Sequence, residues 1–272
     1  MSHFQLMPLR IFNNKIWNVL KVIIDPQNDL FKLAKEQAKL KSKFTMASSQ
    51  SGKVRDNETK YQRQLMGCMA EIYADEFLKE FLLEFELNYL FSILRYDNVR
   101  TDGYKSAANE FDLKMVASFI KQSYTIECRS SIVFNRSLEN AIEQFDIIGP
   151  YSSTAKEGEK YCHIYIRPLF EVVTSEQKNY TSNDFEKLIS AGFINLYIAG
   201  GCFRSDMIEK GYQKSMKQNE TNYRVVKLTD GFDAIEFKEQ LKERIKIIIQ
   251  RQNSSLKPGD GIQAIAKRDL II

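Results

Sequence analysis

The feature that most constrains the fold is the order in which helix-type and strand-type patterns follow one another after residue 60. Residues 61–88 carry apolar side chains around most of a helix, as expected for a helix packed against a sheet. Three strand-type runs follow, at residues 89–95, 110–117 and 123–131. A helix at residues 138–145 then precedes a strand at residues 161–170. This order predicts an α/β protein with a central mixed β-sheet flanked by helices.

The remainder continues the alternation. We expect a helix, a strand, a helix, a strand and a long helix at residues 183–191, 193–199, 205–216, 222–228 and 232–250. Ser205 is the expected N-cap of its helix. Gly200 and Gly201 predict a tight turn between strand and helix, although such a pair could also approach a phosphate.

The first sixty residues have a different pattern. Residues 11–41 show apolar side chains at three-to-four spacing, and Pro26 should divide them into two helices. Residues 47–58 are rich in Ser, Gly and charge, which predicts a linker. We therefore expect a helical N-terminal extension and linker at 1–60, an α/β domain at 61–250 and a loose C-terminal tail at 251–272.

Composition excludes several kinds of protein. The chain of 272 residues has only two histidines, too few for a Ser-His-Asp triad or a histidine-rich zinc site, so any hydrolysis must use carboxylates and cations. Its four cysteines are far apart, which predicts reduced, packed thiols. The sequence contains neither a membrane-spanning apolar run nor a signal-peptide cleavage site, so a cytoplasmic protein is expected.

Acidic and basic residues alternate along two neighbouring strand-type runs. Side chains two residues apart in a strand share a face, so Asp112 lies beside Lys114, and Glu127 beside Arg129. If the two strands pair, Asp112 and Glu127 can meet at one edge of the sheet, and Glu71 could reach them from the preceding helix. Such carboxylates suit Mg²⁺, with Mn²⁺ as a substitute, and a metal with a neighbouring cation suits phosphodiester hydrolysis.

At these residues the chain resembles the PD-(D/E)xK, restriction-endonuclease-like nuclease superfamily. The resemblance covers residues 62–170 and consists of an acid on a helix, an Asp on a strand (F-D-L-K) and an acid-x-cation motif on the next strand (I-E-C-R). It implies a restriction-endonuclease-like fold with Glu71, Asp112 and Glu127 as metal ligands. Arg129 stands where the family has lysine, and an arginine cannot act as a general base. Either Arg129 or Lys114 could supply the catalytic positive charge.

The function implied is a Mg²⁺-dependent endodeoxyribonuclease of type II restriction type, acting on double-stranded DNA. A homodimer is expected by analogy with enzymes that cut both strands of two-fold sites, and a partner methyltransferase is compatible with that function. The main alternative is a non-catalytic DNA-binding or accessory protein on the same fold. A salt-bridged strand pair would carry the same motif, and a small-molecule α/β enzyme is a third interpretation, for which no nucleotide motif is present.

Several basic residues are candidates for DNA contacts because their side chains suit phosphates and base edges. They are Arg167, Arg204, Lys210, Lys214, Lys217 and Arg224. A second basic group crowds the first sixty residues, where it predicts either a solvated helix face or a phosphate-contacting arm; its members are Arg10, Lys15, Lys21, Lys32, Lys35, Lys39, Lys41, Lys43, Lys53, Arg55 and Lys60. His163, in an apolar strand, is expected to be a hydrogen-bonded structural residue.

Overall fold

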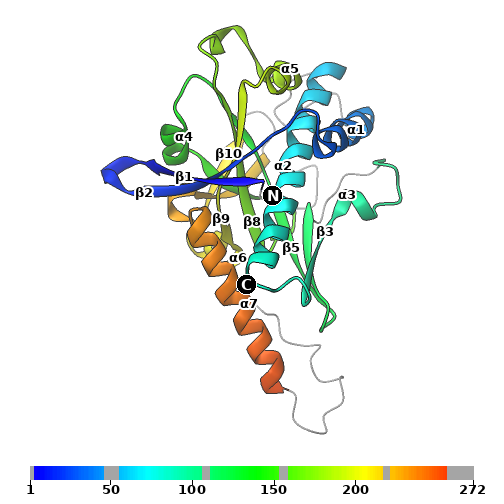
Figure 1. Ribbon diagram of the computed structural model, residues 1–272, viewed down its shortest axis with the longest axis vertical. Helices are drawn as coiled ribbons and strands as arrows, with labels where there is room; N and C mark the ends of the chain where they lie inside the picture. The colour runs from blue at the N-terminus through cyan, green and yellow to red at the C-terminus, as the bar shows by residue number, and fades with distance from the viewer. Residues whose placement is uncertain (1–2, 46–54, 106–110, 153–158, 217–220, 256–272) are drawn as a thin grey trace.

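The computed structural model describes residues 3–45, 55–105, 111–152, 159–216 and 221–255 (Figure 1). Its larger sheet has eight strands and mixes parallel with antiparallel pairing, which confirms the predicted α/β class with a mixed central sheet. In spatial order the strands are β1 (Phe4–Arg10), β2 (Ile16–Val22), β9 (Ile194–Phe203), β8 (Ile164–Val172), β5 (Gln122–Cys128), β4 (Leu113–Ala117) and β3 (Phe91–Arg95), with β6 (Ser131–Val133) also pairing with β8.

A smaller sheet and several helices pack around this centre. The smaller sheet contains β10 (Tyr212–Met216), β11 (Thr221–Lys227) and β7 (Asp146–Ser152). The α-helices are α1 (Asp29–Phe44), α2 (Asn57–Glu84), α3 (Tyr96–Val99), α4 (Leu138–Gln144), α5 (Phe185–Ser190), α6 (Arg204–Glu209) and α7 (Ala234–Ser255). Short 3-10 helices lie at Phe12–Asn14, Gln177–Asn179, Ser182–Asp184 and Leu228–Asp230.

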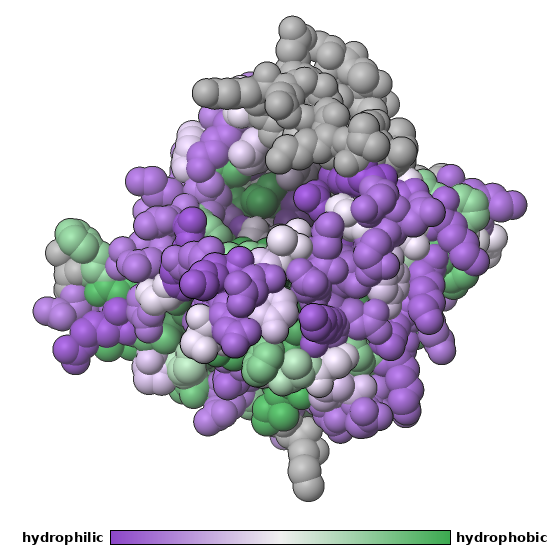
Figure 2. Space-filling view, turned by 90° about the horizontal axis from the view of Figure 1, so that it is seen from above, coloured by the Kyte–Doolittle hydropathy of each residue, from purple (hydrophilic) through white to green (hydrophobic). Residues whose placement is uncertain are grey.

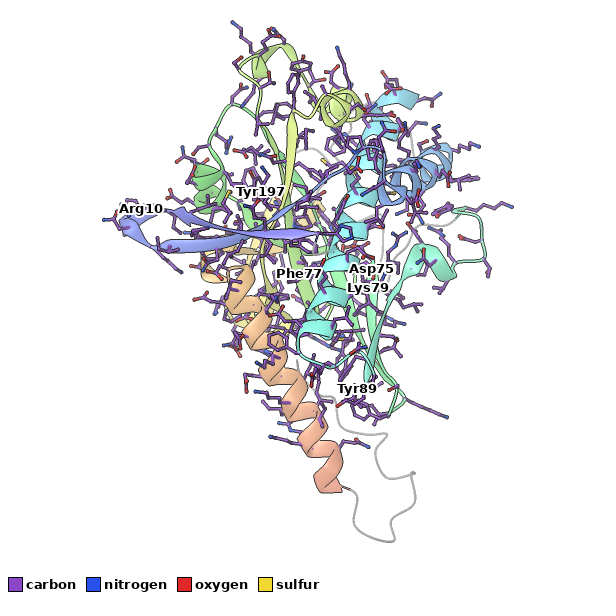
Figure 3. The ribbon with its side chains drawn as sticks, viewed as in Figure 1. Arg10, Asp75, Phe77, Lys79, Tyr89 and Tyr197 are labelled. Atoms are coloured by element: carbon purple, nitrogen blue, oxygen red, sulfur yellow. The ribbon has the colours of Figure 1, made fainter. Side chains whose placement is uncertain are left out.

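Helices α2 and α7 cover one face of the larger sheet. Phe77 of α2 and Phe237 of α7 stack with ring centroids 6.3 Å apart, and both belong to the core that includes Leu113 and Ile126 of the sheet (Figures 1 and 3). Helices α1 and α5 continue this layer around the first half of α2. The opposite face is covered by α4, α6 and the smaller sheet. None of the helices in the described ranges is both long and apolar enough to cross a membrane.

The N-terminal segment departs from the prediction. Residues 4–22 form the β1–β2 hairpin, so the helix expected before Pro26 is wrong, whereas the helix expected after it is confirmed as α1. The buried side chains of Trp17 and Val19 suit a strand, and β2 pairs with β9 inside the larger sheet. The described part of residues 1–60 therefore joins the central sheet, while the linker predicted at 47–58 lies mostly outside the described residues.

Strand β1 lies at one edge of the larger sheet, and the outer end of its hairpin carries Arg10 (Figure 3). Pro8 occupies the middle of this edge strand and has no N–H to offer to a further strand. A proline at such a position protects a sheet edge from pairing with another chain.

The region around residues 200–216 also differs. Gly200 and Gly201 lie inside β9, not in a turn: Gly200 has φ 139°, and a Cβ there would lie 2.1 Å from the Phe232 carbonyl oxygen. Helix α6 ends at Glu209, and Tyr212–Met216 is strand β10, so the helix expected at 205–216 is only partly right. Ser205 lies within α6, whose N-cap is Phe203.

The remaining predicted elements are confirmed with small shifts of their ends. They are the helices α2, α4, α5 and α7 and the strands β3, β4, β5, β8, β9 and β11. Strands β6, β7 and β10 were not predicted. The C-terminal tail lies outside the described residues, except that α7 extends to Ser255.

Candidate active site

Asp112 and Glu127 lie near each other at one end of the β4–β5 pair. The antiparallel register ends with Leu113 opposite Ile126, so Asp112 lies just before β4, beside the end of β5 that carries Glu127. The Asp112 N–H donates to the Ile126 carbonyl oxygen at 3.1 Å, and the Cys128 N–H donates to Asp112 Oδ2 at 2.8 Å. The expected neighbouring strands are present, and they bring the two acids to the same end of the sheet.

The acid-x-cation motif is an ion pair in the structure. Glu127 and Arg129 project to the same side, and Arg129 Nε lies 2.6 Å from Glu127 Oε1. Arg129 Nη2 also lies 2.5 Å from Glu159 Oε2, and the guanidinium stacks 4.1 Å from the Tyr151 ring centroid. Burial lowers the pKa of Arg129, but the charges of Glu127 and Glu159 outweigh it and raise the pKa overall. Arg129 is thus held protonated between two carboxylates.

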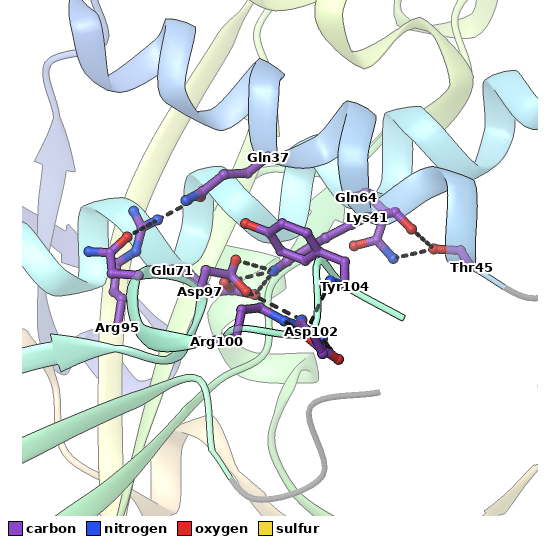
Figure 4. Close-up of polar contacts among 11 residues, drawn as sticks. Gln37, Lys41, Thr45, Gln64, Glu71, Arg95, Asp97, Arg100, Asp102 and Tyr104 are labelled. Atoms are coloured by element: carbon purple, nitrogen blue, oxygen red, sulfur yellow. Dashed lines mark hydrogen bonds and ion pairs between the residues drawn. The ribbon is translucent and has the colours of Figure 1, made fainter. Parts of the chain in front are cut away.

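Glu71 reaches the site from helix α2 but already has a cationic partner. Lys41 of α1 lies 3.0 Å from Glu71 Oε2 and 2.6 Å from Asp97 Oδ2 (Figure 4). Arg100 extends the network, because its Nε lies 2.8 Å from Asp102 Oδ1 and its Nη1 lies 3.7 Å from Asp97 Oδ1. The side chains of Lys41 and Glu71 are only 15% and 14% exposed, so this is a largely buried ionic cluster.

The three acids act on one another electrostatically. Burial raises the pKa of Asp112 well above its ordinary value, and the negative charges of Glu127 and Glu71 raise it further. Burial also raises the pKa of Glu71, and the opposing effect of Lys41 is smaller. Asp112 forms no ion pair with an ammonium or guanidinium of the described ranges, and the Cys128 N–H and the charge of Lys41 offset the rise of its pKa only in part.

These charges bear on whether a metal ion would fit. Across the described ranges, no group of three or more His, Cys, Asp or Glu side chains is arranged as a ready-made metal cluster. Asp112 and Glu127 nevertheless offer oxygen ligands of the kind that Mg²⁺ prefers. A divalent cation beside Asp112 would compensate a buried carboxylate that neighbouring acids destabilise. Glu71 could act as a ligand only if it shared its carboxylate with Lys41.

Lys114 is the second candidate for the catalytic positive charge. It is half-buried, and its Nζ lies 4.1 Å from the ring centroid of Phe111. Phe111 packs in the core on the side of the smaller sheet, whereas Leu113 packs on the α2 side. The prediction that Phe111 and Leu113 share one face of a strand, with Asp112 and Lys114 on the other, is therefore wrong at Phe111. Regular alternation begins at Leu113, where β4 starts. No carboxylate in the described residues forms an ion pair with Lys114, in contrast to Arg129.

Most residues predicted to contact DNA are engaged within the protein. Arg167 is 2% exposed; its Nη1 and Nη2 donate to the Arg129 carbonyl oxygen and to Ser131 Oγ, and burial lowers its pKa to about 10. In this conformation the Arg167 guanidinium is buried away from a surface duplex. Arg224 donates to the carbonyl oxygens of Met207 and Ile208, both at 2.7 Å, at the end of α6.

The other members of that group are nearer to solvent. Lys210 pairs with Asp206 at 3.0 Å, and Lys214 pairs with Asp146. Arg204 is half-buried at the start of α6, and Lys217 lies outside the described residues.

Three functional candidates were not assigned to the site from the sequence. Lys41 was recognised only as one of many N-terminal basic residues, and Asp97 and Glu159 belong to no motif. The helical spacing of Lys41 could not reveal its partners, which come from α2 and α3. His163 is hydrogen-bonded as predicted, with Nδ1 2.9 Å from Thr125 Oγ1, and all four cysteines are buried with their thiols reduced.

Comparison with known proteins leaves the family open. No protein family model matches the chain, and no solved structure matches it significantly. The chain is similar to a protein of Methanocaldococcus jannaschii named "Uncharacterized protein MJECS01", with 25% identity over 259 residues, which is 86% of this chain and 89% of that protein.

Proposed function

We propose that this protein is a Mg²⁺-dependent endodeoxyribonuclease of the PD-(D/E)xK, restriction-endonuclease-like class. The observation that carries the proposal is the meeting of Asp112 and Glu127 at one end of the β4–β5 pair, with Asp112 forming no ion pair among the described residues. The order of the parts also supports it: an acid on helix α2, an Asp at the start of β4, the E-x-R motif at the end of β5, and a helix, α4, that follows.

In this proposal the residues divide the chemistry between them. Asp112 and Glu127 would hold the metal ion, which when bound polarises the phosphoryl group and activates water. Hydrogen bonding to the Cys128 N–H fixes the Asp112 carboxylate, and Arg129 orients Glu127 through its Nε. The Lys114 ammonium stabilises negative charge on the phosphate, because its positive charge is not neutralised by a described carboxylate.

One observation favours the alternative of a non-catalytic DNA-binding protein. Arg129 is bound by both Glu127 and Glu159, as expected if the motif is a structural ion pair. Removing one partner of a buried pair destabilises a protein, so this arrangement could be maintained for folding alone. The two functions differ in one measurable property, which is cleavage.

A plasmid assay tests the proposal. Supercoiled DNA is incubated with the full chain in Mg²⁺, in Mn²⁺ and in excess EDTA, and nicked and linear products are measured. We expect cleavage with either metal, none with EDTA, and a loss of at least about 100-fold in Asp112→Asn and Glu127→Gln, because each removes a metal ligand. Glu84→Gln is the control, since Glu84 is half exposed and pairs with Lys238 away from the site.

The outcomes separate the candidates. Metal-independent cleavage, or full activity in Asp112→Asn, would refute the proposed site. A gel shift without cleavage by the wild-type chain would favour the DNA-binding alternative. The type II interpretation further expects a homodimer, and light scattering on the full chain with a palindromic duplex measures that directly.

A further inference from the structure

The outer side of helix α1 carries a row of lysines. Lys32, Lys39 and Lys43 are exposed, and their spacing of seven and four residues places them on one side of the helix. We refer to these three residues as the α1 lysine row. One exposed acid, Glu36, lies on the same side. Seen from above, the coloured surface of the molecule is mostly hydrophilic (Figure 2).

The positive charges of this row are largely uncompensated. No acid of the described ranges pairs with Lys39 or Lys43. Lys32 pairs with Asp29, but both side chains are mostly exposed, at 60% and 99%, and such pairs contribute little. The row therefore presents ammonium groups that are available to an anionic partner.

The row also borders a concave surface. Lys32, Lys35 and Lys39 line a shallow pocket together with one acid, Glu36, and with Gln27 and Ser190. Lys35 is anchored there by Glu186 at 2.5 Å. A concave surface with several N–H donors suits a phosphate group better than an apolar ligand.

Helix α1 is fixed next to the candidate active site. Lys41 points inward to Glu71 and Asp97, while Lys39 and Lys43, two residues to either side, are exposed. Thr45 at the end of α1 accepts a hydrogen bond from Gln64 Nε2 at 3.0 Å, beside the exposed Arg63. The pKa of Arg55, just before α2, is lowered by burial and then by the nearby charge of Arg63.

The basic residues predicted from the sequence to contact DNA are less available to a duplex than the α1 lysine row. Arg167 is buried, Arg224 donates to backbone carbonyl oxygens, and Lys214 pairs with Asp146. Binding DNA through them would require breaking contacts within the protein, whereas Lys39 and Lys43 need only release counterions.

We infer that the α1 lysine row binds the phosphate backbone of double-stranded DNA. The choice of DNA as the partner rests on the proposed function. The surface itself rests on the exposed, uncompensated lysines of a helix that Lys41 joins to the site. Backbone contacts of this kind position a duplex without reading its sequence.

Binding of the full chain to a fluorescent duplex in EDTA, where metal-dependent cleavage cannot occur, tests this inference. Anisotropy is measured between about 50 and 200 mM salt for the wild type and for the Lys39→Gln/Lys43→Gln double variant. The matched control is Lys242→Gln/Lys246→Gln, which removes two lysines with the same spacing from α7. We expect the α1 variant to reduce the slope of log K against log salt by about 2, and the control to leave it unchanged.

Each outcome decides the inference. Equal effects of the two double variants, or no DNA binding by the wild type, would overturn it. Tighter binding of an RNA duplex would overturn DNA as the partner. If the wild type binds DNA through Lys39 and Lys43 but does not cleave a plasmid, the inferred binding surface is supported and the proposed nuclease function is refuted.

Discussion

The Lys41 ammonium lies 3.0 Å from the Glu71 carboxylate and thereby ties helix α1 to helix α2 beside the candidate active site. Both side chains are largely buried, and Asp97 shares the ammonium at 2.6 Å. The resemblance assigns Glu71 to metal binding, yet Lys41 already neutralises it. Lys41 belongs to residues 1–60, which the sequence pattern predicted to be a separate extension. This contact connects folding of the N-terminal region to the geometry of the site.

Replacing Lys41 by methionine should strongly destabilise the protein. The change leaves the buried Glu71 carboxylate without its cation and Asp97 with only the longer contact to Arg100, and such a loss typically costs about 3–5 kcal/mol. Urea denaturation measures the loss. Lys32→Met is the control and should cost less than about 1 kcal/mol, because its pair with Asp29 is exposed. Equal losses in the two variants would show that the Lys41 pairs contribute no more than a surface pair.

Asp112→Asn should change how stability depends on pH. The pKa of Asp112 is raised in the folded state by burial and by Glu127 and Glu71. As pH rises above the unfolded value near 4, the unfolded chain releases this proton first, so the free energy of unfolding falls until the folded pKa is passed. The variant lacks this loss, and its stability relative to the wild type should increase from mildly acidic to neutral pH in urea titrations. A pH-independent difference between the two proteins would contradict the raised pKa.

Divalent cations should stabilise the wild-type protein through Asp112 and Glu127. Binding to the folded state alone adds about 2.7 kcal/mol at a metal concentration 100 times the Kd, and thermal unfolding with and without Mg²⁺ or Mn²⁺ measures the gain. Asp112→Asn and Glu127→Gln should lose most of it, while Glu84→Gln should keep it. An equal gain in all four proteins would place the metal elsewhere.

We expect Lys114 to act in catalysis and Arg129 to act in the stability of the fold. Lys114 has no described carboxylate partner, so Lys114→Met should reduce plasmid cleavage by about 100-fold while changing stability by less than about 1 kcal/mol. Arg129→Met leaves the largely buried Glu127 and the half-buried Glu159 without their cation and should cost several kcal/mol in urea denaturation. If the wild type cleaves DNA and Lys114→Met cleaves it equally well, the catalytic positive charge comes from Arg129 instead.

Part of the site could be predicted because strand geometry is local. Alternation places Glu127 and Arg129 on one side of a strand, and their ion pair confirms it. The prediction that the Asp112 and Glu127 strands are neighbours also holds, since a short turn joins β4 to β5. By contrast, the three-to-four spacing around Trp17 suited a helix, yet the segment pairs with β9, a partner far away in the chain.

By itself, the sequence determined the α/β class, the succession of most helices and strands after residue 60, and the shared side of Glu127 and Arg129. These properties follow from hydrophobic periodicity and backbone geometry, which act over a few residues. Only the tertiary structure decided that Lys41 neutralises Glu71, that Glu159 shares Arg129 and that Arg167 is buried. Those facts depend on contacts between segments distant in the chain, where burial and charge compensation select the partners.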